Sequence, residues 1–498
     1  MGIVYISGLE SHLPLHKTTQ IMDLTEGPVS RHLLRLALPM IIAFIFVTSY
    51  NFIDRLFVSA LGDIAIAAVG MAFTLQMVIY SIGSGIGAGI NSFISRNLGA
   101  GKTDQATNSA MNGLLMAVLI GLSMIVIIIP SQRFIFGLMG AEGELLQNIL
   151  DYLTVILWFS PVILLTMFAG SIFQGYGDTM SPMRFSLLGT SLNLLLDPLL
   201  IFGFGRVPDG VPMAFLFNLI PDPAALFGAS FPAMGIAGAA FATGISQAIA
   251  LLYILWKMLL KHQPVRLPFR RLRFDLEIIL GINKVGLPSS AGQVMTSLSR
   301  ALVFWVLAPF GPDALAAYTI IFTFDMVVFL PAIGISQAVT TLTGHNYGAG
   351  KPLRVKQTYR AGVGIAFAMM GSLALLILAR PAASVGLFTD SPAVLSLGTT
   401  GLLYSALGMI SLAAYLPAVS SFQGLGLGNQ YFIASILRLF VFMFPMVYFG
   451  ARWLGLEGVW LGLMGMNVLS AIVLFLWHRY ILNSKIITGR QDPLGQSS

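Results

Sequence analysis

Asn97-Leu-Gly-Ala-Gly-Lys102 recurs 249 positions later as Asn346-Tyr-Gly-Ala-Gly-Lys351, and this repetition decides the fold. The shift is not local, because other segments keep it. Three separate motifs in one register indicate a tandem duplication that covers most of the chain. The two further pairs are Leu36-Ala-Leu-Pro39 with Val285-Gly-Leu-Pro288, and Phe173-Gln-Gly-Tyr-Gly177 with Phe422-Gln-Gly-Leu-Gly426.

The composition is typical of a protein that crosses a membrane many times. Of the 498 residues, 56% are hydrophobic and only 9% are charged. Twelve apolar runs are long enough to cross about 30 Å of hydrocarbon. They lack the two-residue alternation of a membrane barrel, which favours helices. The predicted spans are 33–61, 64–94, 106–130, 148–172, 183–205, 234–260, 279–309, 315–341, 358–380, 394–420, 430–450 and 456–482.

Six spans in each repeat bring both halves into the membrane from the same side, as in parallel-repeat transporters. The predicted fold class is an all-α integral membrane protein, with twelve transmembrane helices in two six-helix lobes related by a parallel internal repeat. The predicted divisions are a cytoplasmic N-terminal tail at 1–32, an N-terminal lobe at 33–260, a cytoplasmic linker at 261–278, a C-terminal lobe at 279–482 and a cytoplasmic C-terminal tail at 483–498.

The formal net charge of +7 is explained by where the basic residues lie. If the N-terminus is cytoplasmic, most Lys and Arg residues fall in cytoplasmic segments, which is the positive-inside rule. The basic surplus therefore encodes orientation and predicts no nucleic-acid partner. We expect a multi-pass protein of a prokaryotic cytoplasmic membrane with both termini inside the cell. The segments predicted to lie outside hold only Arg55, Arg133, Arg206, Arg380 and Arg452.

Several kinds of site are absent from the sequence. The chain has no cysteine, which excludes disulfides and thiolate metal sites. Residues 1–30 lack the apolar core and cleavage site of a signal peptide. No metal-ligand cluster, nucleophile elbow or paired catalytic histidine motif is recognisable. The sequence therefore argues against a membrane enzyme, and no cofactor is predicted beyond a coupling ion.

Ser191-Leu-Asn193-Leu-Leu-Leu-Asp197-Pro198 places an amide and an acid inside an apolar run. Four residues separate Asn193 from Asp197, so on a helix both side chains project from one face about a turn apart. A carboxylate at bilayer depth costs roughly 3 kcal/mol even on the lenient insertion scale, so one without a purpose should be rare. We interpret the pair as part of an ion site.

The duplication supplies a control, because positions that serve only as scaffold should look alike in both halves. Asp54, in the first span, is a second acid of the N-terminal half that has no acidic counterpart in the other half. Function is therefore expected where the halves differ. The positions opposite Asp54, Asn193 and Asp197 are Val303, Phe440 and Phe444.

The chemistry of this set suits a small cation. Asp54, Asn193 and Asp197, with Thr243 of the sixth span at comparable depth, offer hard oxygen ligands of the kind that suit Na⁺. Two neighbouring acids in a low dielectric also suit proton carriage. The sequence leaves Na⁺ and H⁺ open. For Asp54 the alternatives are an ion pair with the adjacent Arg55 or a place near the outer headgroups.

Other features of the spans also leave alternatives open. Pro39 removes a helical hydrogen bond and favours a bend, which is either a fixed kink or a functional hinge. Arg300, Asp325 and Arg438 lie inside apolar spans of the C-terminal half, where either a bracing Asp–Arg pair or contacts with a substrate would account for them. Residues 206–233 are an insertion, expected as an outside loop that lies on the membrane or caps the cavity.

The chain resembles the multidrug and toxic compound extrusion (MATE) transporters, particularly the prokaryotic branch with the DinF-like and archaeal members. The resemblance covers about residues 33–482 and is specific because several modest motifs occur in order within doubled lobes. These motifs are Asn51-Phe-Ile-Asp54, Val58-Ser-Ala-Leu-Gly62, Ala67-Ala-Val-Gly70, Gly175-Tyr-Gly-Asp178, Leu192-Asn-Leu-Leu-Leu-Asp-Pro198 and Gly235-Ile-Ala-Gly-Ala-Ala-Phe-Ala-Thr243.

The resemblance implies a V-shaped antiporter of twelve helices that expels organic cations or other amphipathic compounds against entry of Na⁺ or H⁺. By position, its cation site would be Asp54, Asn193, Asp197 and Thr243, and cation binding would act by bending the first span at Pro39. The expected partners are small-molecule substrates and membrane lipids, with the protein as a monomer. The chain lacks the acids that some members carry in the seventh and tenth spans, so no second cation site is expected there.

A lipid-linked oligosaccharide flippase is the alternative, because such flippases share this helical plan. A flippase of this kind requires a cationic central cavity for a pyrophosphate. Only Arg300 and Arg438 would provide that charge in this chain.

Overall fold

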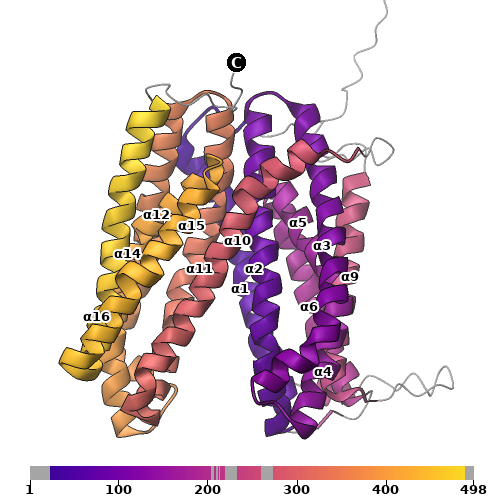
Figure 1. Cartoon of the computed structure of the whole chain (residues 1–498), viewed down its shortest axis with the longest axis vertical. Coiled ribbons are helices and arrows are strands. Elements are labelled where there is room, and N and C mark those ends of the chain that lie inside the picture. Colours follow the sequence, from indigo (N-terminus) through magenta and orange to yellow (C-terminus); the bar gives the residue numbers. More distant parts are fainter. Residues whose placement is uncertain are drawn as a thin grey trace, which may run out of the picture.

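A computed structural model describes residues 23–203, 207–208, 211, 214–218, 233–259 and 273–487. Within these residues the chain is helical with short connecting turns (Figure 1). The helices of the first half are α1 Val29–Ser59, α2 Asp63–Gly99, α3 Thr103–Leu138, α4 Gly143–Trp158, α5 Ser160–Gly175, α6 Met180–Phe202, α7 Ala214–Asn218 and α9 Gly235–Leu259. Those of the second half are α10 Leu276–Leu307, η2 Ala308–Phe310, α11 Pro312–Gly348, α12 Pro352–Leu378, α13 Pro381–Gly386, α14 Pro392–Gly424, α15 Gly428–Ile436, the π-helical η3 Leu437–Met443, α16 Phe444–Ile481 and the π-helical η4 Leu482–Ile487.

The expected twelve membrane passes are all found in the described part of the chain. Ten helices are long and apolar enough to cross a membrane, and α4 with α5, bent by 51°, forms one more pass. The 57-residue run Gly428–Ser484 holds two passes, because Gly455 adopts a φ of +65° and turns the chain back. The two arms pack closely, since a Cβ added at Gly450 would lie 2.3 Å from the carbonyl oxygen of Gly458.

The internal repeat is visible in the helix bounds themselves. The helices α2 and α11, Asp63–Gly99 and Pro312–Gly348, begin and end 249 positions apart. The first residue of α4 and the last residue of α5 likewise lie 249 positions before the first and last residues of α14. The fold class predicted from the sequence is therefore confirmed, and one local difference between the lobes bears on the N-terminal site.

That difference is the bend in the fourth pass, which the sequence prediction treated as one uninterrupted span at 148–172. Pro161, in the first turn of α5, cannot donate a backbone hydrogen bond, and Phe159 ends α4. Gly244 of α9 permits this geometry, because a Cβ there would lie 2.2 Å from the Phe159 ring. α14, which carries Ile410 at the repeat position of Pro161, runs unbroken.

The two lobes meet along α1 and α2 of the first half and α10 and α11 of the second (Figure 1). We call the end of the bundle with the turns at 100–102 and 349–351 the linker end, and the opposite end, where α6 stops at Phe202, the insertion end. The lobes lie together at the linker end and diverge toward the insertion end, as the lower part of Figure 1 shows.

Repeated glycines form the contact at the linker end. A Cβ added at Gly99 would lie 2.1 Å from the carbonyl oxygen of His345, and one at Gly348 would lie 2.0 Å from that of Arg96. The two Gly-Ala-Gly motifs thus pack against each other with pseudo-twofold symmetry. Helices approach this closely only where side chains are small.

Polar contacts join the lobes at the same end. Thr341 Oγ1 donates to Asn91 Oδ1 at 3.1 Å, and a ring nitrogen of His345 lies 2.9 Å from the carbonyl oxygen of Gly175. Lys351 Nζ of the second lobe also donates to the carbonyl oxygen of Thr25, which precedes α1, at 3.1 Å. Thr25 in turn donates to Asp23, which lowers the pKa of that carboxyl.

Some predicted features cannot be compared with the structure. Most of the predicted linker 261–278 and of the insertion 206–233 falls outside the described residues, as do most of the two predicted tails.

Candidate functional site

The structure brings together the four residues predicted for the N-terminal lobe. Asp54 lies on α1, Asn193 and Asp197 on α6, and Thr243 on α9, and each is less than 9% exposed. We call these four residues the N-lobe acid cluster. Each acid lies five residues before the end of its helix at the insertion end of the lobe.

Asn193 organises the N-lobe acid cluster. Its Nδ2 donates to Asp197 Oδ1 at 3.1 Å and to Thr243 Oγ1 at 3.3 Å. The carboxyl groups of Asp54 and Asp197 also interact directly, side chain to side chain. Two carboxyl groups can share a hydrogen bond only if one of them carries a proton.

Several buried oxygen atoms in and beside the N-lobe acid cluster make no hydrogen bond among the described residues. Asp54 Oδ1, Asn193 Oδ1 and the nearby Ser246 Oγ have no hydrogen-bond partner among the described residues. A buried polar atom without a partner costs free energy, which a bound ion or proton would recover. All donors in the set are hard oxygen atoms, so the residues present fit Na⁺ as well as H⁺.

Two residues of this region were missed by sequence reasoning. Tyr152 of α4 is buried close enough to Asp54 and Asp197 to interact with them electrostatically. Gln76 of α2 donates from Nε2 to the Tyr152 hydroxyl at 3.3 Å. No motif marks Tyr152, because only the packing of α4 brings it to the acids. For Gln76 the sequence offered one indication, because this polar residue occupies the repeat position of Asp325.

The alternative pairing of Asp54 with Arg55 is not formed. The guanidinium of Arg55 instead lies over the ring of Phe73, 5.1 Å from its centre. In the part of the chain that the structure describes, the single ion pair joins Lys257 Nζ to Asp178 Oδ2 at 3.4 Å. Among the described residues, Asp54 is therefore a buried acid that forms no ion pair.

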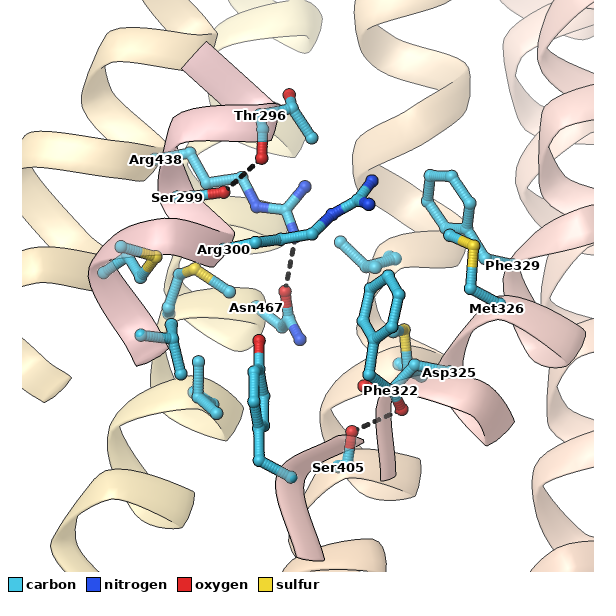
Figure 2. A pocket seen from close by; sticks show the side chains of 17 residues that line it. Thr296, Ser299, Arg300, Phe322, Asp325, Met326, Phe329, Ser405, Arg438 and Asn467 are labelled. Carbon is cyan, nitrogen blue, oxygen red and sulfur yellow. Dashed lines mark hydrogen bonds between the residues drawn. The ribbon is translucent and has the colours of Figure 1, made fainter. Parts of the chain in front are cut away.

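In the C-terminal lobe, Arg300, Asp325 and Arg438 line one cavity of about 130 Å³ (Figure 2). They do not form the bracing Asp–Arg pair that was one of two interpretations, so that interpretation is wrong. Asp325 Oδ1 accepts from Ser405 Oγ at 2.5 Å, and Arg438 Nη2 donates to Asn467 Oδ1 at 2.8 Å. These short polar contacts keep both charged groups at the cavity wall.

A second cavity of about 290 Å³ adjoins the first, because Thr296, Arg300 and Arg438 line both. It extends across the interface to Ser84 and Ala88 of α2 in the other lobe. We call the two together the C-lobe cavity. Aromatic and methionine side chains make up much of its wall, as expected for an adaptable apolar site. They include Phe322, Met326, Phe329, Met409, Tyr415 and Met466.

Pro39 lies inside α1 and is buried. Two residues further on, Ile41 packs against Gly334 of α11, where a Cβ would lie 2.5 Å from an Ile41 side-chain carbon. α1 therefore carries Asp54, Pro39 and a close contact with the second lobe. The choice between kink and hinge stays a prediction.

A family model for MatE matches residues 39–199 and again residues 288–449. The chain belongs to the MATE family of transporters. The two matches fall one in each lobe, in agreement with the duplication. Membership of a transporter family also confirms that the protein is not an enzyme.

Similar proteins cover nearly the whole chain. A FAD transporter of Shewanella oneidensis is 27% identical over 470 residues, which are 91% of this chain and 95% of that protein. The multidrug export protein MepA of Staphylococcus aureus is 24% identical over 447 residues, 89% of this chain and 92% of that protein. A solved structure, described as the outward-facing conformation of a multidrug resistance MATE family transporter of the MOP superfamily, has a TM-score of 0.84 at 28% identity. It covers 94% of this chain and 99% of that one.

Proposed function

We propose that this MATE transporter is a secondary active exporter that moves amphipathic compounds, organic cations among them, out of the cell against entry of Na⁺ or H⁺. The observation that carries the proposal is the N-lobe acid cluster, with its two interacting carboxyl groups and its unpartnered buried oxygens. A MATE relative is a multidrug exporter and another a FAD transporter, which supports export of large organic molecules.

The coupling mechanism rests on α1. A cation or proton that reaches Asp54 and Asp197 removes the repulsion between two carboxylates and satisfies the free oxygens. Because α1 also packs on α11, a change at Asp54 can be passed to the second lobe, with Pro39 as the bending point. Exchange requires that the ion and the exported compound favour different lobe arrangements.

The orientation follows from the same proposal. The linker end carries the basic loops and would face the cytoplasm, so the lobes would diverge toward the outside. An external ion would then reach the N-lobe acid cluster from its nearer end. The predicted domain divisions, a monomeric state and membership of the DinF-like or archaeal-type branch belong to the same proposal.

Lipid-linked oligosaccharide flipping is the second candidate function. It is favoured by Arg300 and Arg438, which place two positive charges in the C-lobe cavity where a lipid pyrophosphate would lie. Binding of a lipid pyrophosphate without any ion-driven export of smaller compounds would select this candidate.

The test is gradient-driven transport in liposomes. Efflux of a fluorescent lipophilic cation and of FAD would be followed under an imposed Na⁺ gradient and then under a pH gradient. Wild type would be compared with Asp197→Asn and with Asp151→Asn, an exposed acid of α4 that serves as the matched control. We expect transport under one gradient, its loss in Asp197→Asn and its retention in Asp151→Asn. Normal transport by Asp197→Asn under both gradients would rule the site out.

A further inference from the structure

The C-lobe cavity holds two guanidinium groups without a carboxylate partner. Arg300 projects from α10 and Arg438 from the π-helical η3, and Figure 2 shows both side chains in the same cavity wall. Among the described residues, neither lies within 4.0 Å of an acidic oxygen. π-helical turns are rare in proteins and occur frequently at functional sites.

The guanidinium groups of these two arginines make fewer hydrogen bonds than their N–H groups allow. Each guanidinium has five N–H donors. The guanidinium of Arg300 lies over the ring of Phe322, 4.7 Å from its centre, and that of Arg438 lies 4.9 Å from the ring centre of Tyr415. Ring faces stabilise a cation but accept few of its hydrogen bonds. Arg438 also hydrogen-bonds two neutral groups, the amide oxygen of Asn467 and the hydroxyl of Tyr415.

Asp325 does not balance the charge. Its carboxyl group accepts from Ser405, and Figure 2 shows that pair at a distance from the two guanidinium groups. The cavity thus carries two positive groups and one acid. Unbalanced charge inside a membrane protein is expensive, and a bound anion would compensate it.

The first lobe carries no arginine at the positions that correspond to Arg300 and Arg438. The repeat positions of Arg300 and Arg438 are Asn51 and, in the register that places Asp197 opposite Phe444, Ser191. The positive charge is therefore particular to the second lobe, just as the acid pair is particular to the first. A feature that only one copy of a duplicated scaffold carries is not needed to hold that scaffold together.

We propose that Arg300 and Arg438 bind the phosphate of the exported compound, with its aromatic or apolar part against the Phe, Tyr and Met side chains of the C-lobe cavity. Planar guanidinium groups bind phosphate through paired hydrogen bonds. The adjoining space reaches Ser84 and Ala88 of α2, so the apolar part lies where the two lobes meet. This inference rests on the proposed export function and names one chemistry among its amphipathic substrates, that of compounds with a phosphate.

Equilibrium binding of flavin mononucleotide and riboflavin tests the proposal. The two probes share one ring system, and only the first has a phosphate. The full chain would be placed in phosphatidylcholine nanodiscs without any ion gradient, and flavin fluorescence would report binding. We expect flavin mononucleotide to bind at least about tenfold more tightly than riboflavin, because hydrogen bonds to charged groups are strong.

Four variants sharpen the test. Arg300→Met and Arg438→Met should each lower affinity for flavin mononucleotide about tenfold and leave riboflavin within about twofold. Asn467→Asp, which places a carboxylate 2.8 Å from Arg438 with little change of shape, should do the same. Asp325→Asn should act in the opposite direction and tighten flavin mononucleotide binding. The matched control is Arg380→Met, which removes an exposed arginine of the same lobe.

Retained riboflavin binding shows that a variant is folded, and Arg438→Lys replaces Arg438→Met if it is not. Equal affinity for the two probes in wild type would overturn the proposal, as would an unchanged affinity ratio in the arginine variants. Nanodiscs that contain phosphatidylglycerol test whether the site binds a lipid headgroup instead. If that lipid displaces flavin mononucleotide and Asn467→Asp abolishes the displacement, the site holds a lipid headgroup and the proposal is wrong. Because no gradient is used, failure of the antiport proposal leaves this result unaffected.

Discussion

The two lobes share one scaffold and carry opposite charges in it. In the N-terminal lobe, α1 and α6 present Asp54 and Asp197. In the C-terminal lobe, the corresponding helix pair, α10 with α15 and η3, presents Arg300 and Arg438. The paired glycine contacts at the linker end, in contrast, are nearly the same in both copies.

This comparison separates what holds the protein together from what it binds. Close packing needs small residues at the crossings, and both copies keep them. Charges in the membrane interior add cost rather than stability, so each lobe keeps only those it uses. Under the two proposals above, ion coupling belongs to the first lobe and substrate charge to the second, and the following experiments test that division.

The largest effect is expected from the acids themselves. Asp54→Asn and Asp197→Asn should each lower ion-driven efflux at least about 100-fold, because an ion with no preference between the two lobe arrangements cannot drive exchange. Asp313→Asn, which alters an exposed acid of α11 in the other lobe, is the matched control and should keep ion dependence, with rates within about threefold. The measurement is efflux from liposomes under the gradient that drives wild type. An equal loss of efflux in all three variants would contradict the proposal that ion coupling belongs to the first lobe alone.

Scaffold glycines should act on the conformation rather than on either ligand. Gly348→Ala places a Cβ 2.0 Å from the Arg96 carbonyl oxygen, and overpacking of this kind costs about 1–3 kcal/mol. The packed linker end should therefore become less populated by about tenfold. Because the chain has no native cysteine, disulfide formation between Asn91→Cys and Thr341→Cys reports this directly. Gly137→Ala, with open space around its Cβ, should cross-link as wild type does.

The hydroxyl of Thr243 should have a moderate effect. Thr243→Val removes a hydroxyl that accepts from Asn193, and one such hydrogen bond contributes about 1 kcal/mol. The half-saturating concentration of the coupling ion should rise about fivefold, whereas flavin mononucleotide binding should not change. Thr296→Val, which alters the wall of the C-lobe cavity, should show the converse. Changes of both ligands in either variant would contradict separate sites.

The smallest effect is expected at the two repeated prolines. If Pro39 is a hinge, Pro39→Ala restores a straight helix and should slow turnover about threefold without changing ion affinity. Pro288→Ala is its counterpart in α10, which carries no coupling acid, and it should leave turnover unchanged. Single-turnover efflux measures both. Identical behaviour of the two variants would mean that both prolines are fixed kinks.

Much of this protein was determined by the sequence alone. The spans, the duplication and the family depend on local properties, namely apolar runs of sufficient length and motifs that recur in one register. The grouping of Asp54, Asn193, Asp197 and Thr243 was also predictable, because charged and polar residues are rare at membrane depth. Asn193 and Asp197 lie one helical turn apart, so their hydrogen bond is nearly a local one.

Tertiary structure alone decided which side chains from different helices meet. Tyr152 reaches the acids only because α4, which ends at the bend at Phe159, packs beside α2 and α9. Arg300 and Arg438 line a cavity instead of pairing with Asp325, which depends on how three helices are rotated about their axes. An apolar sequence encodes that rotation weakly, because lipid and protein interior are nearly equally favourable surroundings for an apolar face. The sequence therefore determines what crosses the membrane, and close packing at small residues determines what each polar group faces.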